Sequence, residues 1–186
     1  MPSSFSHPAP AVALATLFRS GDLPRSAIVT GMVCSTLPDL DALGFYVGVS
    51  RSSMLSHRGI THSIPFAVVL ALVAALLLRG MTKDRTHLGK LWLYLFLATA
   101  SHGVFDALTN GGRGVAFLAP FSPARYFFPF RPIEVSPIGI TRFFSERWRA
   151  VLASECRWVW LPSLVFLVVA HLLRSLCDGP VRGRGR

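Results

Sequence analysis

An uninterrupted apolar stretch, IPFAVVLALVAALLL over residues 64–78, limits what this chain can fold into more than any other feature of its sequence. As a helix the stretch would rise about 22 Å, so it needs less apolar flanks to cross a hydrocarbon core of roughly 30 Å. Pro65 stands where proline favours the first turn of a helix. The stretch therefore predicts a membrane-spanning helix.

Two further apolar segments, 88–108 and 158–176, have the length of membrane helices. The second has tryptophans at its start and Arg174 near its end, which is typical of spans anchored at both interfaces. Of the 186 residues, 52% are hydrophobic and 15% are charged, whereas soluble domains carry about 25% charged residues. We therefore expect a single integral membrane domain over residues 1–178 and a disordered basic tail at 179–186.

The first forty residues contain two shorter apolar stretches, 9–18 and 26–38, separated by the turn-forming sequence RSGDLPR. The first stretch would be only about 15 Å long as a helix, which is too short to span alone. We expect a helical hairpin that enters the membrane and returns, so that His7 at its start lies near Asp39 at its end. The N-terminus has no basic segment typical of a signal peptide, so His7 is expected to be retained.

The connection 109–157 is rich in glycine, proline, phenylalanine and arginine, and residues 117–139 contain five prolines. Such a sequence cannot form a continuous helix, and it is too aromatic for a disordered linker. We expect an ordered lid at 113–137 on the membrane surface. The predicted fold is all-α: a polytopic helical bundle in the membrane with a short N-terminal helical hairpin and an irregular lid between the last two spans.

The formal net charge is +10, but the arginines are scattered among apolar and aromatic residues. Membrane lipid is therefore the expected partner of these basic flanks, and no nucleic acid is expected. The three cysteines have no CxxC spacing, so neither a zinc ribbon nor a disulfide framework is implied.

Each crossing of the membrane changes the side on which the chain lies, and this predicts where the polar side chains meet. The hairpin returns to the side of His7, the sequence SHRGITHS at 56–63 follows on that side, and helix 88–108 comes back to it. His87 falls in the loop on the opposite side and His171 within the last span, so neither is expected to be a ligand. The residues that this topology gathers at one membrane face are His7, Asp39, Asp41, His57, His62, His102 and Asp106.

Imidazoles and carboxylates at one membrane depth are costly unless they are paired or bind a cation. His102 and Asp106 are four residues apart and share a helix face. His57 and His62 are about 140° apart on a helix, which favours a loop around the site, with Ser63 capping the next helix. Each of these features alone also fits a solvated turn or a structural hydrogen bond. Together they predict a site for a divalent metal ion, zinc or manganese before iron, with one or two ions per chain.

Four motifs, in this order, resemble the YdjM-like family of membrane-bound metal-dependent hydrolases, some described as LexA-regulated. They are LPDLD at 37–41, SHRGITHS at 56–63, SHGVFDALTNGGRGVAFLAPFSPARYFFP at 101–129 and IEVSPIG at 133–139. The resemblance covers about residues 5–143 and implies a multi-pass protein of the bacterial inner membrane with metal-dependent hydrolase activity. Carried over by position, it implies the same seven polar residues, although Pro8 after His7 departs from the pattern.

The leading functional hypothesis is a hydrolase in which a metal-activated water attacks an ester or phosphoester, which could be lipid-derived. Asp41 or Asp106 is the expected general base. Arg58, Arg113 and Arg125 are the expected contacts to an anionic substrate, or else they bind lipid headgroups nonspecifically.

The alternatives are a metal-ion or proton-coupled transporter and a membrane scaffold with a structural metal. The apolar middles of 64–78 and 158–170 offer no polar track across the membrane, which argues against transport. The distribution of basic residues over short loops slightly favours a site that faces the periplasm.

Overall fold

The structure is a computed structural model that describes residues 1–19, 21–50, 52–82, 86–137, 144 and 147–177. Its regular elements within these residues are helices, and two isolated β-bridges join loop residues, which confirms the all-α class. In chain order the helices are η1 (Ser4–Ser6), α1 (Pro8–Ala15), α2 (Arg25–Thr36), η2 (Leu37–Phe45), η3 (Ile60–His62), α3 (Ile64–Met81), α4 (Leu88–Ala107), α6 (Trp148–Glu155), the π-helix η4 (Cys156–Trp160) and α7 (Leu161–Cys177).

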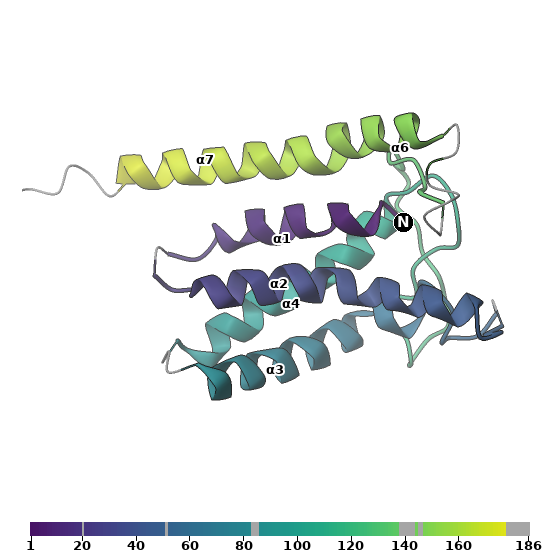
Figure 1. The fold of residues 1–186 in the computed structure, drawn as a ribbon, viewed down its shortest axis with the longest axis horizontal. Helices are drawn as coiled ribbons and strands as arrows, with labels where there is room; N and C mark the ends of the chain where they lie inside the picture. The colour runs from purple at the N-terminus through teal and green to yellow at the C-terminus, as the bar shows by residue number, and fades with distance from the viewer. Residues whose placement is uncertain (20, 51, 83–85, 138–143, 145–146, 178–186) are drawn as a thin grey trace, which may run out of the picture.

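Helix α4 forms the centre of the bundle, where it crosses behind α1, α2 and α3 and contacts all three (Figure 1). The side chains of Leu91, Tyr94 and Leu95 on α4 are almost completely buried. The Tyr94 ring lies so close to Gly31 of α2 that a side chain at that position would clash with it. The Tyr94 hydroxyl donates to the carbonyl oxygen of Ala11 at 3.1 Å, which ties α4 to α1.

Small residues make the close helix contacts. On α3, Ala67, Ala71 and Ala75 are buried at four-residue intervals, and Ala27 and Gly31 repeat this spacing on α2. Apolar side chains larger than these would hold the helices apart, so small residues at this spacing are typical of helix packing in membranes.

The N-terminal hairpin is present as predicted. Helices α1 and α2 lie side by side, and the chain returns through η2 to the end of the bundle at which it started (Figure 1). The Nε2 atom of His7 consequently lies 4.0 Å from the Oδ2 atom of Asp39.

Within the described residues, three helices are long and apolar enough to cross a membrane: Arg25–Phe45, Ile64–Met81 and Trp148–Leu176. The predicted span at 88–108 is a helix, α4, but among the described residues it does not belong to this set. Its polar residues lower its hydropathy, and they are tolerated because its neighbours surround it.

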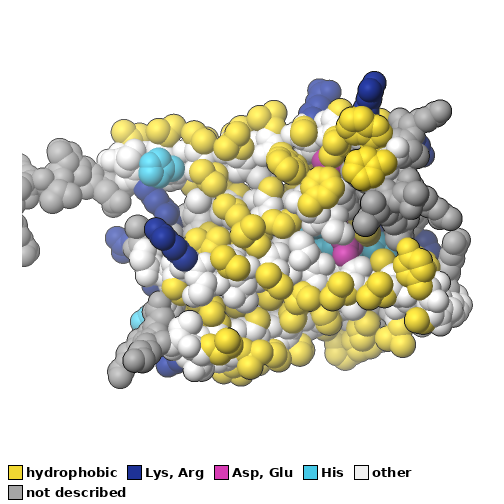
Figure 2. Space-filling view, viewed as in Figure 1, with side chains coloured by type: hydrophobic (Ala, Val, Ile, Leu, Met, Phe, Trp, Pro, Cys, Tyr) yellow, Lys and Arg dark blue, Asp and Glu magenta, His cyan; other side chains and the backbone are white. Residues whose placement is uncertain are grey.

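The outer surface of the bundle is apolar. Figure 2 shows hydrophobic side chains over much of one face, whereas lysine and arginine side chains gather toward the two ends. Exposed valine, leucine and phenylalanine side chains continue along α3 and α7. A surface of this kind suits helices that face lipid.

The last helix begins earlier than the sequence suggests. We expected residues 158–176, but helix starts at Trp148 and continues through the π-helix into α7. The charged residues of 148–157 were interpreted as loop. Glu155 is buried instead, because the N-terminal segment supplies hydrogen-bond donors to its carboxylate.

The described part of the predicted lid, residues 113–137, is irregular and lies over the end of the bundle where His7 lies. It is held by backbone hydrogen bonds, including Ile64 N to Phe117 O at 2.9 Å and Ser136 N to Met1 O at 2.9 Å. The lid is therefore ordered in its described residues. The predicted disordered tail, 179–186, lies outside the described residues.

Candidate metal centre

The structure brings all seven predicted polar residues to one end of the bundle. His7 directly precedes α1, η2 carries both aspartates of LPDLD, and α4 carries the last two residues of the set. His57 lies in the loop before η3, and His62 is the last residue of η3. Pro38 lies in the first turn of η2, and the short 3-10 turns let the chain change direction at each motif.

Two imidazoles face each other at the centre of this group. The Nε2 atoms of His62 and His102 are 3.0 Å apart, and both rings are buried. The Nδ1 atom of His102 lies 2.7 Å from the carbonyl oxygen of Ser35 and donates its hydrogen there. The Nδ1 atom of His62 lies 3.2 Å from a carboxylate oxygen of Asp41. Each ring therefore directs Nε2, not Nδ1, into the centre of the group.

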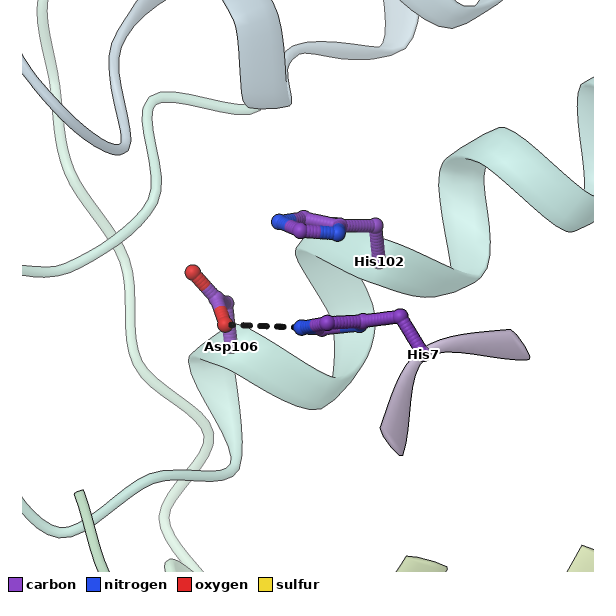
Figure 3. Close-up of side chains that lie close together, drawn as sticks. All are labelled: His7, His102 and Asp106. Carbon is purple, nitrogen blue, oxygen red and sulfur yellow. Dashed lines mark ion pairs between the residues drawn. The ribbon is translucent and has the colours of Figure 1, made fainter. Parts of the chain in front are cut away.

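Two carboxylates border the same space. The Oδ1 atom of Asp39 lies 3.3 Å from His102 Nε2, and the Oδ2 atom of Asp106 lies 3.3 Å from His62 Nε2. His7 completes the set: its ring stacks on that of His102 with 3.7 Å between centroids, and its Nε2 points at Asp106 Oδ1 at 3.9 Å (Figure 3).

Several of these buried atoms have no hydrogen-bond partner among the described residues: His7 Nε2, Asp39 Oδ1 and Asp106 Oδ1. Buried polar atoms without partners are rare, because each forfeits its interaction with water. One cation near them would satisfy nitrogen and oxygen donors together. Ligand atoms of His7, His102 and Asp106 lie within 4.8 Å of one another. The residues present thus fit a divalent metal ion.

Asp41 lies behind the imidazoles and orients them. Its Oδ1 atom is 2.6 Å from His57 Nδ1, and its Oδ2 atom accepts from the Thr61 hydroxyl at 2.5 Å. His57, Asp39 and His62 also offer ligand atoms within 4.8 Å of one another. His57 is the most exposed of the histidines in the group, so it lies at its edge.

The histidines outside the spans differ in their affinity for protons. Burial lowers the pKa of His7 to about 3, so its imidazole is neutral and can offer a lone pair. Burial also lowers the pKa of His57, although its hydrogen bond with Asp41 opposes the shift. Burial would lower the pKa of His62 as well, but its hydrogen bonds with Asp106 and Asp41 outweigh it and raise the pKa to about 9.

Arg58 is fully enclosed, which the sequence did not indicate. Its Nε atom lies 3.1 Å from Asp106 Oδ2, while its two terminal nitrogens donate to Thr109 Oγ1 and to the carbonyl oxygens of Gly111 and Arg113. Arg58 adopts a positive φ of 63°, so the surrounding structure holds it in this position. The cation is thus built into the wall of the site, beside Asp106.

The two other predicted arginines lie farther out. Arg125 donates to the carbonyl oxygens of Ser53, His57, Arg58 and Gly114 and to the Ser56 hydroxyl, and it thereby fixes the SHRGITHS loop. Arg113 has an exposed side chain. Together with Phe45, His57 and Val135 it lines a cavity of about 250 Å³ next to the polar group. Of the three, Arg113 is the one with its charge at an accessible surface.

Sequence reasoning missed a second polar cluster beside the site. Ser4 donates from its hydroxyl to Asp39 Oδ2 at 2.6 Å, and Ser3 and Ser6 bond to Glu155. The three serines that precede His7 in SSFSH could have indicated this cluster, since three hydroxyls next to an apolar helix need hydrogen-bond acceptors. His87 and His171, which were not expected to be ligands, are exposed and lie outside the polar group.

Comparison with known proteins agrees with the membrane character of the fold. The chain matches the family described as YdjM inner membrane protein over residues 1–176. It is also similar to a protein of Escherichia coli (strain K12) named Inner membrane protein YbcI, with 34% identity over 167 residues, which cover 90% of this chain and 95% of that protein. No solved structure matches the chain.

Proposed function

Because the chain belongs to the YdjM inner membrane protein family, we propose that it is a multi-pass, metal-dependent hydrolase of the inner membrane. The observation that carries the proposal is the group of buried nitrogen and oxygen atoms without hydrogen-bond partners at His7, Asp39 and Asp106. A cavity opens beside this group. A buried cation site next to a cavity suits catalysis better than support alone.

The residues proposed to hold the ion are His62, His102, Asp39 and Asp106, with His7 as a further ligand. Their atoms face a common space. The Nδ1 atoms of His62 and His102 point away from it and contact Asp41 and the carbonyl oxygen of Ser35, respectively. Such outer contacts fix ring orientation and strengthen the ligand. Zinc and manganese both accept this mixture of imidazole and carboxylate.

When bound, the metal would lower the pKa of a water molecule toward neutrality and polarise the scissile bond of an ester or phosphoester. The attacking water must pass its proton to a base. Asp106 and Asp41 are the carboxylates proposed for this role. Asp106 faces the unpartnered atoms directly, whereas Asp41 is engaged by His57 and Thr61. Asp106 is therefore the stronger candidate, because one of its oxygens can bind the ion while the other accepts the proton, and Asp41 keeps both neighbouring imidazoles in position.

The cavity suits a substrate that has an anionic group and an apolar part. Arg113 brings a cation to its lining, while Phe45 and Val135 supply apolar walls. Arg58 and Arg125 strengthen the positive field, although their hydrogen bonds also hold the loops in place. The cavity lies at the end of an apolar bundle, so an ester derived from a membrane lipid could reach it from the bilayer.

The direct test is hydrolysis by purified protein in detergent. Metal-free protein is loaded with Zn²⁺ or Mn²⁺ and assayed with phosphomonoesters, phosphodiesters and lipid esters, beside His102→Ala and the matched control His87→Ala. We expect turnover only with metal, lost in His102→Ala and retained in His87→Ala. Full activity of metal-free protein would refute the proposal. Tight metal binding without turnover of any of these esters would favour the structural-metal scaffold.

A further inference from the structure

A buried carboxylate outside the metal centre has no part in the chemistry proposed above. Glu155, the last residue of α6, is completely buried. Its Oε1 atom accepts from the backbone nitrogen of Ser3 at 2.6 Å and from the Ser3 hydroxyl at 2.8 Å, and its Oε2 atom accepts from the Ser6 hydroxyl at 2.6 Å. Three short hydrogen bonds to one carboxylate form a strong link between distant parts of the chain.

The π-helix directly after Glu155 gives this link a second arm. The indole nitrogen of Trp160 donates to the Ser6 hydroxyl at 2.8 Å, so Ser6 bonds to both Glu155 and Trp160. Residues five apart would lie about 140° apart on a regular α-helix. In η4 the backbone bond runs from Leu161 N to Cys156 O, five residues back, and this wider turn aligns such residues. The π-helix thus presents both side chains to one serine.

Residues 3–6, which Glu155 and Trp160 hold through Ser3 and Ser6, lead directly to His7 in the metal centre. Ser6 adjoins His7, and Ser4, between the two linked serines, donates to Asp39. The Nε2 atom of His7 itself has no hydrogen-bond partner among the described residues. The position of this ring therefore depends on where the backbone of residues 3–6 is held and on its stacking against His102.

We propose that Glu155 is a positioning residue, which acts from the last helix through Ser3 and Ser6 to place His7 as a metal ligand. This inference rests on the metal site proposed above. It also gives the π-helix a role, because the wider turn brings Glu155 and Trp160 to the same side, where both bond to Ser6.

The test is a double-mutant cycle on metal affinity with full-length protein in detergent. Zn²⁺ affinity is measured by competition with a chelator for wild type, Glu155→Gln, His7→Ala and the double variant. We expect Glu155→Gln to weaken Zn²⁺ binding about tenfold. The double variant should bind Zn²⁺ no more weakly than His7→Ala alone, because Glu155 acts through His7. The absorption spectrum of bound Co²⁺ should change in the same way in both single variants.

A purely structural role predicts other results. In that case the losses in affinity would add in the double variant, or Glu155→Gln would lower thermal stability with an unchanged Co²⁺ spectrum, and either result would overturn the inference. Glu134→Gln, which neutralises a half-buried carboxylate paired with Arg147 outside the metal centre, is the matched control and should leave Zn²⁺ affinity unchanged.

If Glu155→Gln does not fold, Trp160→Phe tests the other arm of the link, since it removes the indole donor to Ser6 and replaces the indole with a smaller ring. Trp92→Phe is its control, because the indole of Trp92 bonds to Val68 on the far side of α4 from η4. A wild-type protein that binds no metal would refute the proposed function and this inference together. Normal binding by wild type with additive losses would refute the inference alone.

Discussion

His62 and His102 direct Nε2 atoms at each other over 3.0 Å, although 40 residues separate them in the chain. Neither ring can turn away easily, because Asp41 and Ser35 engage their Nδ1 atoms. Two lone pairs at this distance repel unless a proton or a metal ion lies between them. The two imidazoles therefore either share one proton or both bind a metal ion, and the metal content of purified protein distinguishes these two states.

Alanine at His62 or at His102 should remove most of the bound metal. Each substitution removes one ligand nitrogen and leaves the other imidazole of the pair beside an empty space, so too few ligands remain to complete the coordination of the ion. Metal content is measured by elemental analysis of purified protein. His87→Ala is the control, since His87 is exposed at the start of α4. Equal metal content in all three variants would contradict the assignment.

Zinc affinity should rise with pH. The pKa of His62 in the metal-free protein is raised to about 9 from 6.5, so its stabilising charge is fully present below pH 6.5 and is lost as pH rises through about 9. The ion must displace this proton. Apparent Zn²⁺ affinity should therefore increase about tenfold per pH unit between about 6.5 and 9, while the metal-free protein becomes less stable. An affinity that does not change over this range would contradict the protonated state of His62.

Replacing Arg58 should destabilise the protein strongly. Arg58→Met leaves the buried Asp106 carboxylate without its cation and deprives Thr109 and two carbonyl oxygens of their donor. Loss of one partner of a buried ion pair lowers the free energy of unfolding by about 3–5 kcal/mol. Arg147→Met removes an exposed pair with Glu134 and should change it by less than about 1 kcal/mol. Denaturant titration of metal-free protein measures both values.

Arg113 and Arg125 should separate substrate binding from folding. Arg113→Ala removes the cation of an exposed residue that lines the cavity, so it should raise KM for an anionic ester about tenfold and lower Tm less than Arg125→Ala does. Arg125→Ala removes donors to several backbone carbonyls and should lower Tm by about 5 °C or more. Thermal melts and steady-state kinetics of both variants decide the point. If the two substitutions changed KM equally and also changed Tm equally, Arg113 and Arg125 would not have separate roles in substrate binding and folding.

The ends of the N-terminal hairpin should face the same side of the membrane. Single cysteines at the exposed positions Ser4 and Ser52, in a background without native cysteines, should react with an impermeant thiol reagent from one side. A cysteine at Gly89, beyond the α3 crossing, should react from the other side. Labelling of Ser4 and Ser52 from opposite sides would exclude the hairpin.

The sequence was enough to predict that the seven polar residues meet at one end of the bundle. This prediction needs only the number of times the chain is expected to cross the membrane between them, and the apolar stretches indicate that number. The packing around these residues could not be predicted. Whether a polar residue of α4 faces lipid or protein depends on which helices enclose it, and the long-range contacts of Tyr94 and Gly31 decide this. Arg58 was predicted to contact substrate, and it lines the cavity, but its ion pair with Asp106 was not foreseen, since the sequence does not show which way a loop side chain turns.

The start of the last helix illustrates the same limit. Charges at Arg149, Glu155 and Arg157 are typical of a loop when they are read locally. Glu155 tolerates burial only because Ser3 and Ser6 reach it from the other end of the chain, and no local pattern contains that information.

The bond between Ser3 and Glu155 joins residues 152 positions apart, and this separation sets an order of events during biosynthesis. The segment before His7 is among the first parts of the described chain to leave the ribosome, whereas α6 and the π-helix follow some 150 residues later. Until α6 has been made, His7 is positioned by its stacking on His102 and by the Ser4–Asp39 bond, without the contacts of Glu155 to Ser3 and Ser6. The contacts that position His7 in the proposed metal site are thus completed only after α6 has been made, and protein truncated before Glu155 should bind Zn²⁺ more weakly than the full chain.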